Sequence, residues 1–494
     1  MITVSRRAFI QALAAAPLAL WSTRYVHAQE TLLVRHDASS AAGLEMLRIY
    51  ADAVTAMHRR SDGDPLSWVW QHYTHFVNGS TTKAAEISRI FGYTPSAQSA
   101  LAGEMWNTCQ SHAGQNANHF LPWHRMYVLF FENIIREVSG RPDFTLPYWN
   151  YTSNDPALRG VVPRGFRLPD DPVYGILYRP DRTRLANNGQ PIHKNQAGDA
   201  MDISTAMAKA NYSSSGGVQG FCRAIDSGIH GKIHVLVGNR YNMGNVPYAA
   251  RDPLFWVHHA NVDRMWASWN RNGGINPVTP TWARRQFVFA DTQGQRVSTE
   301  LRAYFDIESL GYTYDDFIPA PASTLASSLA TQSTTSTGEL ELVARARPVD
   351  LGSRATRTAL RPIAGTPQTE VLGLAADGGS SKRTYLILKD LHAWDQPEVL
   401  YHVYLTPRDG APSPNSFVGS INFFDAEFHD HGGGRLDEAL GENFFSFDVT
   451  DVLLGIAGRR HHGVRDALQV VFVPGGRPRA DAKPLVASIE LVRQ

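Results

Sequence analysis

The chain has 494 residues, of which 19 are histidine and only 2 are cysteine, and its formal net charge is +1. This length predicts more than one domain. So small a net charge gives no electrostatic reason to expect nucleic acid or an anionic membrane surface as a partner, and two cysteines exclude a disulfide framework.

The N-terminal segment has the parts of an export signal in their usual order. The paired arginines Arg6 and Arg7 precede a short run rich in alanine and leucine, which ends in small-residue cleavage chemistry at Ala28. The apolar run is too short to span a membrane as a helix. Residues 1–28 therefore predict a twin-arginine signal peptide, and we expect a periplasmic or secreted protein without a membrane span.

The rest of the chain divides into three segments of different texture. Residues 29–318 alternate helical patterns with loops rich in glycine, proline and asparagine, which predicts a mainly α domain. Residues 319–338 carry no charged side chain and have the composition of a linker. Residues 339–494 contain short alternating strands separated by turn residues, so we expect a smaller β-sandwich-like domain after the helical one.

The first histidines of interest lie on a predicted helix. Asp64 and Pro65 have the residue types of a helix cap and first turn, so we expect the helix to begin there. Trp68, His72 and His75 then share one helix face, because they are spaced at i, i+4 and i+7. Either histidine could face a metal ion, and the other is expected to be a packed core residue.

A second predicted helix begins at His124. Val128 and Phe131 follow on the same face, which places the imidazole where the helix enters the core. Glu132 lies two turns further on and is expected to accept a hydrogen bond from a ligand histidine or from Arg125.

The remaining histidines form a second cluster. His230 and His234 are one helical turn apart, a common way to present two imidazoles to one ion, and Asp226 lies one turn earlier. Asp252 and Pro253 predict the start of another helix, which carries His259. With the first cluster, these segments predict a metal centre enclosed by a helix bundle.

The types of residue around these histidines indicate which metal they bind. Zinc sites that use His-x3-His usually carry an acidic residue in between, but Gly231, Lys232 and Ile233 stand there. Non-haem iron oxygenases use two histidines and a carboxylate. An all-imidazole set favours copper, and six such ligands favour two copper ions that activate O2.

The segments around these histidines resemble the tyrosinase, catechol oxidase and polyphenol oxidase family of type 3 dicopper proteins. The resemblance covers about residues 35–318. It implies a dicopper enzyme that oxidises o-diphenols to o-quinones with O2 and also hydroxylates monophenols. It also implies that the closing tyrosine motif contacts an arginine near the mature N-terminus, here Arg35. The segments that carry it are Phe120-Leu-Pro-Trp-His-Arg125, Leu146-Pro-Tyr-Trp-Asn150, Asp252-Pro-Leu-Phe-Trp-Val-His-His-Ala-Asn-Val-Asp263 and Gly311-Tyr-Thr-Tyr-Asp315.

The resemblance assigns the copper B ligands directly. His230, His234 and His259 fall on the ligand positions of their motifs. His258, the first of the histidine pair, is not a ligand in that pattern and is expected near the mouth of the substrate site. For copper A, only His124 transfers in the same way.

The first copper A ligand is expected to be His75 rather than His72. In the family a Pro-Leu-Ser segment often precedes this ligand by eight residues. That segment is present here as residues 65–67, and counting eight from Ser67 reaches His75.

The second copper A ligand is where the chain departs from its relatives. The family places this ligand nine residues before the third, and Gln115 stands there. We expect His112, with a three-residue insertion after it, rather than His119, which would then be a mouth or surface residue. Several relatives link a cysteine to this histidine by a thioether, but the spacing of Cys109 favours a buried thiol. A disulfide to Cys222 is not indicated by the sequence.

Three positions bear on the substrate. Relatives often have a glutamate four residues before the first copper B histidine, where it orients a water, and Asp226 stands there. Gly231, the residue after that histidine, offers no side chain to help. At the position of a gate residue, Val246 leaves access to a phenol ring open. A reversible O2 carrier of the haemocyanin type and an o-aminophenol oxidase are the alternatives.

The C-terminal half resembles the β domain of plant and some bacterial relatives, which can cover the active site. The segment Phe423–Gly434 is the candidate lid, and the alternative is a hairpin whose phenylalanines pack in the β core. The sequence leaves open the oligomeric state and the need for a copper chaperone.

Overall fold

The computed structural model describes residues 32–110, 118–321, 340–363, 382–426, 444–458 and 467–494. The chain falls into two compact units, Met1–Leu32 and Leu33–Gln494, and the second unit spans both the helical and the β half. The predicted signal peptide lies outside the described residues, as do His112 and most of the predicted linker 319–338. The domain boundaries placed in these segments stay predictions.

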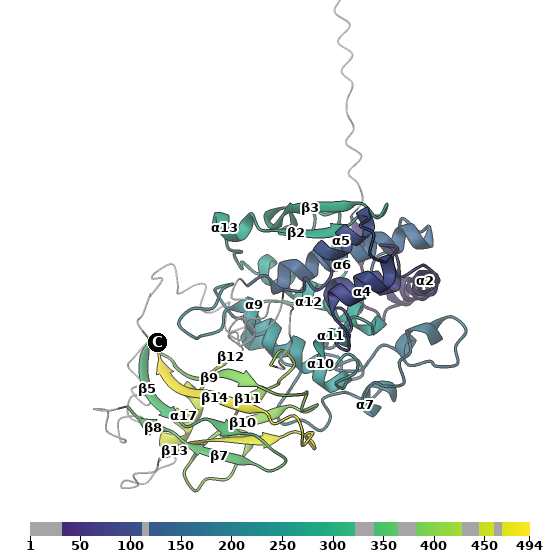
Figure 1. Cartoon of the computed structure of the whole chain (residues 1–494). Helices are drawn as coiled ribbons and strands as arrows, with labels where there is room; N and C mark the ends of the chain where they lie inside the picture. The colour runs from purple at the N-terminus through teal and green to yellow at the C-terminus, as the bar shows by residue number, and fades with distance from the viewer. Residues whose placement is uncertain (1–31, 111–117, 322–339, 364–381, 427–443, 459–466) are drawn as a thin grey trace, which may run out of the picture. The chain divides into compact units, whose positions relative to one another are not determined.

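Helices dominate the first half of the chain (Figure 1). The longest are α2 (Ala41–His58), α6 (Phe120–Ser139) and α12 (Pro253–Arg271), and α6 packs against both of the others. Rings of α6 and α12 interleave in their core, where Phe131 stacks on Trp256 with 3.5 Å between centroids. In the described residues, no helix is both long enough and apolar enough to cross a membrane.

Shorter helices and helical turns complete this half and connect the long ones. Many of them are single turns between loops, as the glycine and proline content predicts. They are α3 (Trp68–His75), α4 (Lys83–Phe91), α5 (Ala97–Met105), η1 (Arg164–Phe166), η2 (Tyr174–Leu177), α7 (Arg184–Asn187), α8 (Ser204–Met207), α9 (Phe221–Arg223), η3 (Ala224–His230), α10 (Gly231–Val237), α11 (Val246–Ala249), α13 (Pro280–Ala283) and η4 (Leu301–Tyr304).

The helix that carries His72 and His75 begins later than the sequence predicts. Asp64 and Pro65 lie in a turn, in which the Asp64 side chain accepts from the Leu66 amide at 2.8 Å. The cap of α3 is instead Ser67, whose hydroxyl accepts from the Trp70 amide at 3.1 Å. The expected start at Pro65 was therefore wrong by one turn. At α12 the predicted Asp252 cap is present and accepts from the Leu254 amide.

Two small sheets belong to the helical half. β1 (Leu33–Arg35) pairs in parallel with β4 (Tyr312–Tyr314) and so joins the start of this half to its end. β2 (Gln286–Ala290) and β3 (Arg296–Glu300) form an antiparallel hairpin.

The second half of the chain contains two antiparallel sheets. A four-stranded sheet has the order β11-β10-β13-β7, and a larger sheet has the order β12-β9-β14-β5-β8, with β6 also paired to β14. Leucine and valine side chains from both sheets form one hydrophobic cluster, as in a sandwich. The elements are β5 (Glu341–Ala346), β6 (Val349–Asp350), β7 (Thr356–Ala359), β8 (Arg361–Pro362), β9 (Thr384–His392), β10 (Tyr401–Pro407), η5 (Pro414–Ser416), β11 (Phe417–Ile421), β12 (Phe444–Asp448), α17 (Thr450–Gly458), β13 (Leu468–Pro474) and β14 (Leu485–Arg493).

A buried ionic cluster joins β1 to α6 and α12. Arg35 donates to Glu132 at 2.8 Å, to Asp263 at 3.0 Å and to the Tyr314 hydroxyl at 3.0 Å. The contact of Arg35 with the tyrosine motif is the one expected by resemblance. The expected partners of Glu132 were wrong, because Glu132 pairs with Arg35 whereas Arg125 pairs with Asp263. Opposite charges inside the core need such pairing to offset the loss of water.

Candidate metal centre

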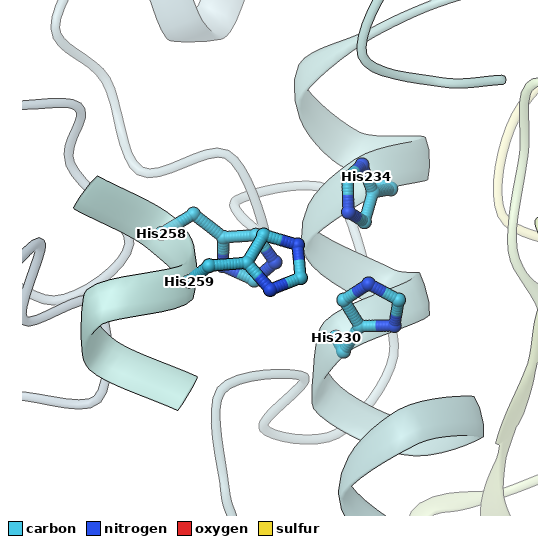
Figure 2. Close-up of side chains that lie close together, drawn as sticks. All are labelled: His230, His234, His258 and His259. Carbon is cyan, nitrogen blue, oxygen red and sulfur yellow. The ribbon is translucent and has the colours of Figure 1, made fainter. Parts of the chain in front are cut away.

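Four histidines from two helical segments meet in the core. His230 ends the π-helical turn η3, and His234 lies one turn further on in α10. His258 and His259 are neighbours on α12 and face these two residues across a gap (Figure 2). One ring nitrogen of each of the four lies within 4.8 Å of the others, and all four side chains are buried.

Hydrogen bonds fix which nitrogen of the ring is available to a metal. The Nδ1 of His230 donates to the Asp226 carbonyl at 3.0 Å, and the Nδ1 of His234 donates to the Met243 carbonyl at 2.6 Å. Since a carbonyl oxygen only accepts, Nδ1 carries the proton and Nε2 is the unprotonated nitrogen. The Nε2 of His234 and both ring nitrogens of His259 are buried and make no hydrogen bond within the described part of the chain.

Burial favours the neutral form of His234 and His259. Loss of water lowers the pKa of His234 and of His259 well below the ordinary value, and neighbouring histidines lower both further. A neutral imidazole is the form that binds metal ions. The donor set, the orphaned nitrogens and the absence of carboxylate between His230 and His234 fit a copper ion.

A second group lies beside the first. His75 at the end of α3 and His124 in α6 have ligand atoms within 4.8 Å of each other and of the Cys109 sulfur. The Nδ1 of His124 donates to the Phe120 carbonyl at 2.9 Å, which again leaves Nε2 unprotonated. Cys109 is buried with its Sγ 3.6 Å from that nitrogen, and no disulfide joins it to Cys222 in the described residues.

The two groups share a boundary. The rings of His124 and His259 stack with 4.3 Å between centroids and 11° between planes. Phe120 packs 4.6 Å from both His124 and His230, and Phe255 packs 5.0 Å from His75 and 4.2 Å from His259. Apolar rings therefore pack against the histidines of both groups.

The other candidate histidines stand apart from both groups. His72 is buried edge-on against Tyr73 and belongs to neither group, whereas His75 lies beside His124; the choice of His75 as ligand stays a prediction. His119 is also buried, stacked on Trp282 at 5.5 Å, so the mouth or surface position expected for it was wrong. Burial lowers the pKa of His119 to about 4. His112 lies outside the described residues, and the choice between His112 and His119 stays a prediction.

Of the three positions tied to the substrate, Asp226 and Gly231 adjoin His230, and Val246 is buried at a separate place in the chain. Asp226 is 3% exposed, and its Oδ1 lies 3.3 Å from the Nδ1 of His230. Arg223 also lies 3.4 Å from the other oxygen of Asp226. Gly231 directly follows His230, and Val246 is buried at the start of α11. Their roles stay predictions.

The C-terminal half contributes a side chain to the site. Phe424 stacks on His234 with 4.0 Å between ring centroids and 8° between planes, and it meets His230 edge-on at 5.5 Å. Its neighbour Phe423 points into the β core against Tyr401. The sequence singled out this segment, but not which phenylalanine reaches the histidines. The part of the candidate lid at 427–434 lies outside the described residues.

Comparison with known proteins points in the same direction as this geometry. The family model "common central domain of tyrosinase" matches residues 67–175 and 170–272. A tyrosinase from Hahella sp. (strain CCB-MM4) is 29% identical over 477 residues, which cover 90% of this chain and 96% of that protein. The latent form of a polyphenol oxidase from Prunus armeniaca is 29% identical over 307 residues, and there the match spans 46% of the relative.

Solved structures support the fold. The structure of latent apple tyrosinase matches with a TM-score of 0.59 at 22% identity and covers 94% of this chain and 97% of that one. This likeness confirms the expected fold class, a helical domain followed by a β domain. Every histidine of the two groups lies within the stretches that the family model matches, and over residues 67–272 the chain is similar to the tyrosinases and polyphenol oxidases.

Proposed function

We propose that the protein is a copper-dependent phenol oxidase, which uses O2 to oxidise o-diphenols to o-quinones and also hydroxylates monophenols at the ortho position. The observation that carries the proposal is the stack of His124 on His259 at 4.3 Å, which brings the two imidazole groups together. Two ions in such adjacent sites can act on one substrate molecule.

The ligands follow from the resemblance and from the tautomers described above. His230, His234 and His259 would hold copper B, and His75 and His124 would hold copper A with a third ligand from His112. Two bound copper ions would supply O2 binding and the two-electron redox chemistry. The buried Nδ1 hydrogen bonds of His124, His230 and His234 orient each ring before the metal arrives.

Other residues act on the substrate. Asp226, whose Oδ1 lies 3.3 Å from the Nδ1 of His230, would orient a water and accept the phenolic proton at a carboxylate oxygen. Phe120 and Phe255 keep the space between the ions dry. Val246, as a small gate residue, leaves room for a monophenol, and His258 would contact the substrate ring from the copper B side.

The C-terminal half would hold the enzyme in a latent state. Phe424 lies flat on His234, where an aromatic substrate would approach copper B. The relative from Prunus armeniaca and the solved apple tyrosinase are both described as latent, and the apple structure matches the fold over 94% of this chain. Displacement of Phe424 would then be needed for a phenol to enter.

The test is a measurement of copper per chain together with O2 uptake on catechol and on phenol. We expect two copper ions, oxidation of catechol, slower oxidation of phenol, and an increase in both rates after cleavage within residues 322–339. One copper per chain, or tightly bound zinc, would contradict the dicopper mechanism. Equal rates before and after cleavage would contradict latency alone.

The cover over His234 also favours a second candidate, a reversible O2 carrier, because a carrier keeps substrates away from its ions. Rapid mixing of the oxygenated protein with catechol separates the two functions. A carrier retains the absorption band of its oxygenated form, whereas an oxidase loses it. Comparing rates on a phenol and the matching o-aminophenol tests the aminophenol oxidase alternative in the same assay.

A further inference from the structure

Gly231 follows His230, and its backbone conformation does not require a glycine. Gly231 begins α10 with φ −61° and ψ −34°, an ordinary helical conformation in which alanine is the better helix former. A Cβ at this position would lie 2.5 Å from the Oδ1 of Asn422 and 2.8 Å from its Nδ2. Glycine is therefore required by the close approach of the Asn422 amide.

Hydrogen bonds hold the Asn422 side chain in this position against Gly231. It is 3% exposed, and its Nδ2 donates to the Ser227 carbonyl at 2.7 Å. Ser227 lies in the π-helical turn η3, three residues before His230. The Oδ1 of Asn422 accepts from the Phe424 amide at 3.2 Å. One buried side chain thus links the helix of the metal ligands to the backbone that carries Phe424.

A second buried amide fixes the same backbone from the other side. The Nε2 of Gln396 donates to the carbonyls of Phe423 and Phe424, at 3.2 and 3.1 Å. Gln396 belongs to the β half, so it holds the segment to its own domain, whereas Asn422 holds it to the catalytic helix. The position of the Phe424 ring over His234 therefore depends on where the Asn422 side chain lies against Gly231.

We propose that Gly231 and Asn422 form a steric lock, which seats Phe424 over the copper B histidines and which any side chain at position 231 releases. In this proposal Gly231 allows Phe424 to cover the site and does not select the substrate. The lock is tested by two measurements, and only one of them, the rate of catechol oxidation, rests on the proposed phenol oxidase function. The other readout, hydrogen exchange of the backbone, reports docking whether or not the protein is an enzyme.

The test uses the copper-loaded full-length chain and the variant Gly231→Ala. Gly103→Ala is the matched control, because Gly103 is also helical and a Cβ there would meet nothing within 4 Å. We expect Gly231→Ala to raise hydrogen exchange in the peptide 417–426 and the rate of catechol oxidation about tenfold each without cleavage. The control should change neither quantity. Unchanged exchange in Gly231→Ala would overturn the lock.

A double-mutant cycle separates the lock from damage to α10 itself. Asn422→Gly removes the side chain that the new Cβ would strike, so Gly231→Ala in that background should add nothing to exchange or copper loss. If the double variant exchanges faster or binds less copper than Asn422→Gly alone, Gly231 does not act through Asn422 and the proposal fails. Faster exchange without catechol oxidation in any form, including cleaved chain, would contradict the proposed function and leave the lock in place.

Discussion

The two halves of the metal centre are built differently. The copper B half comes from the π-helical turn η3, the helix α10 that follows it and the long helix α12, which together place ring nitrogens of four imidazoles within 4.8 Å of one another. The copper A half draws on the end of α3, on α6 and on an irregular segment that contains Cys109, and its remaining expected ligand lies in residues 111–117, outside the described part. Helical periodicity predicts ligand positions well, because residues on one face recur at fixed spacing. An insertion before His124 changes the spacing from which the second copper A ligand would be counted.

The largest effects are expected when the two adjacent histidines of α12 are substituted one at a time. His259→Ala should lose about one copper per chain and lower catechol oxidation on the order of 10³-fold, because a tricoordinate site loses a ligand. His258→Ala should retain both copper ions. Metal analysis and O2 uptake measure both effects, and loss of copper from His258→Ala would mean that this imidazole coordinates.

The copper A half can be tested with the pair on α3. His75→Ala should also lower copper to about one per chain, since its ring nitrogen converges with that of His124. His72→Ala should keep the metal and lower stability only, because this buried ring packs against Tyr73. If the two variants exchanged these outcomes, the assignment of the first ligand would be wrong.

A smaller effect is expected in the scaffold that both halves share. Asp263→Asn removes the negative charge that faces two buried arginines, Arg35 and Arg125, and should lower the free energy of unfolding by about 3–5 kcal/mol. Asp316→Asn is the control, because Asp316 pairs with Arg264 of the same helix but is largely exposed, and it should cost less than about 1 kcal/mol. Urea denaturation compares the two, and equal losses would contradict the role given to burial.

The smallest effect concerns His119, beside the copper A half. Its pKa in the folded protein is about 4, below the ordinary value, so between these values only the unfolded state binds the proton. The stabilisation is complete above about pH 6.5 and is lost as the pH falls toward 4. His119→Phe should keep both copper ions. When the pH falls from 7 to 5, its free energy of unfolding should decrease by about 1 kcal/mol less than that of the wild type, after allowance for solvent screening. Loss of copper would identify His119 as a ligand.

Local patterns in the sequence predicted much of the fold and of the copper B half. The Asp252 cap, the spacing of His230 and His234 and the division into helical and β halves are properties of short segments. The contact of Arg35 with Tyr314 was expected only through the resemblance.

What the sequence could not predict depends on tertiary contacts. Glu132 is within reach of Arg125 along its own helix, yet it pairs with Arg35 from a strand 97 residues away. Phe423 and Phe424 are chemically identical neighbours, yet one packs in the β core and the other on His234, and the buried side chains of Gln396 and Asn422 hold the backbone that directs them. The fit of Asn422 against Gly231 likewise joins segments that carry no mutual signal.

The ionic cluster around Arg35 has a consequence for the order of synthesis. Arg35 finds one of its partners in Tyr314, 279 residues later in the chain. All histidines of the metal centre have been translated by residue 259, but Asp263 receives the hydrogen bonds of Tyr312 and Tyr314 only after β4 emerges. A nascent chain that has not passed residue 314 therefore contains every described ligand without the pairing of β1 with β4 that completes the scaffold, so copper should enter only after that point.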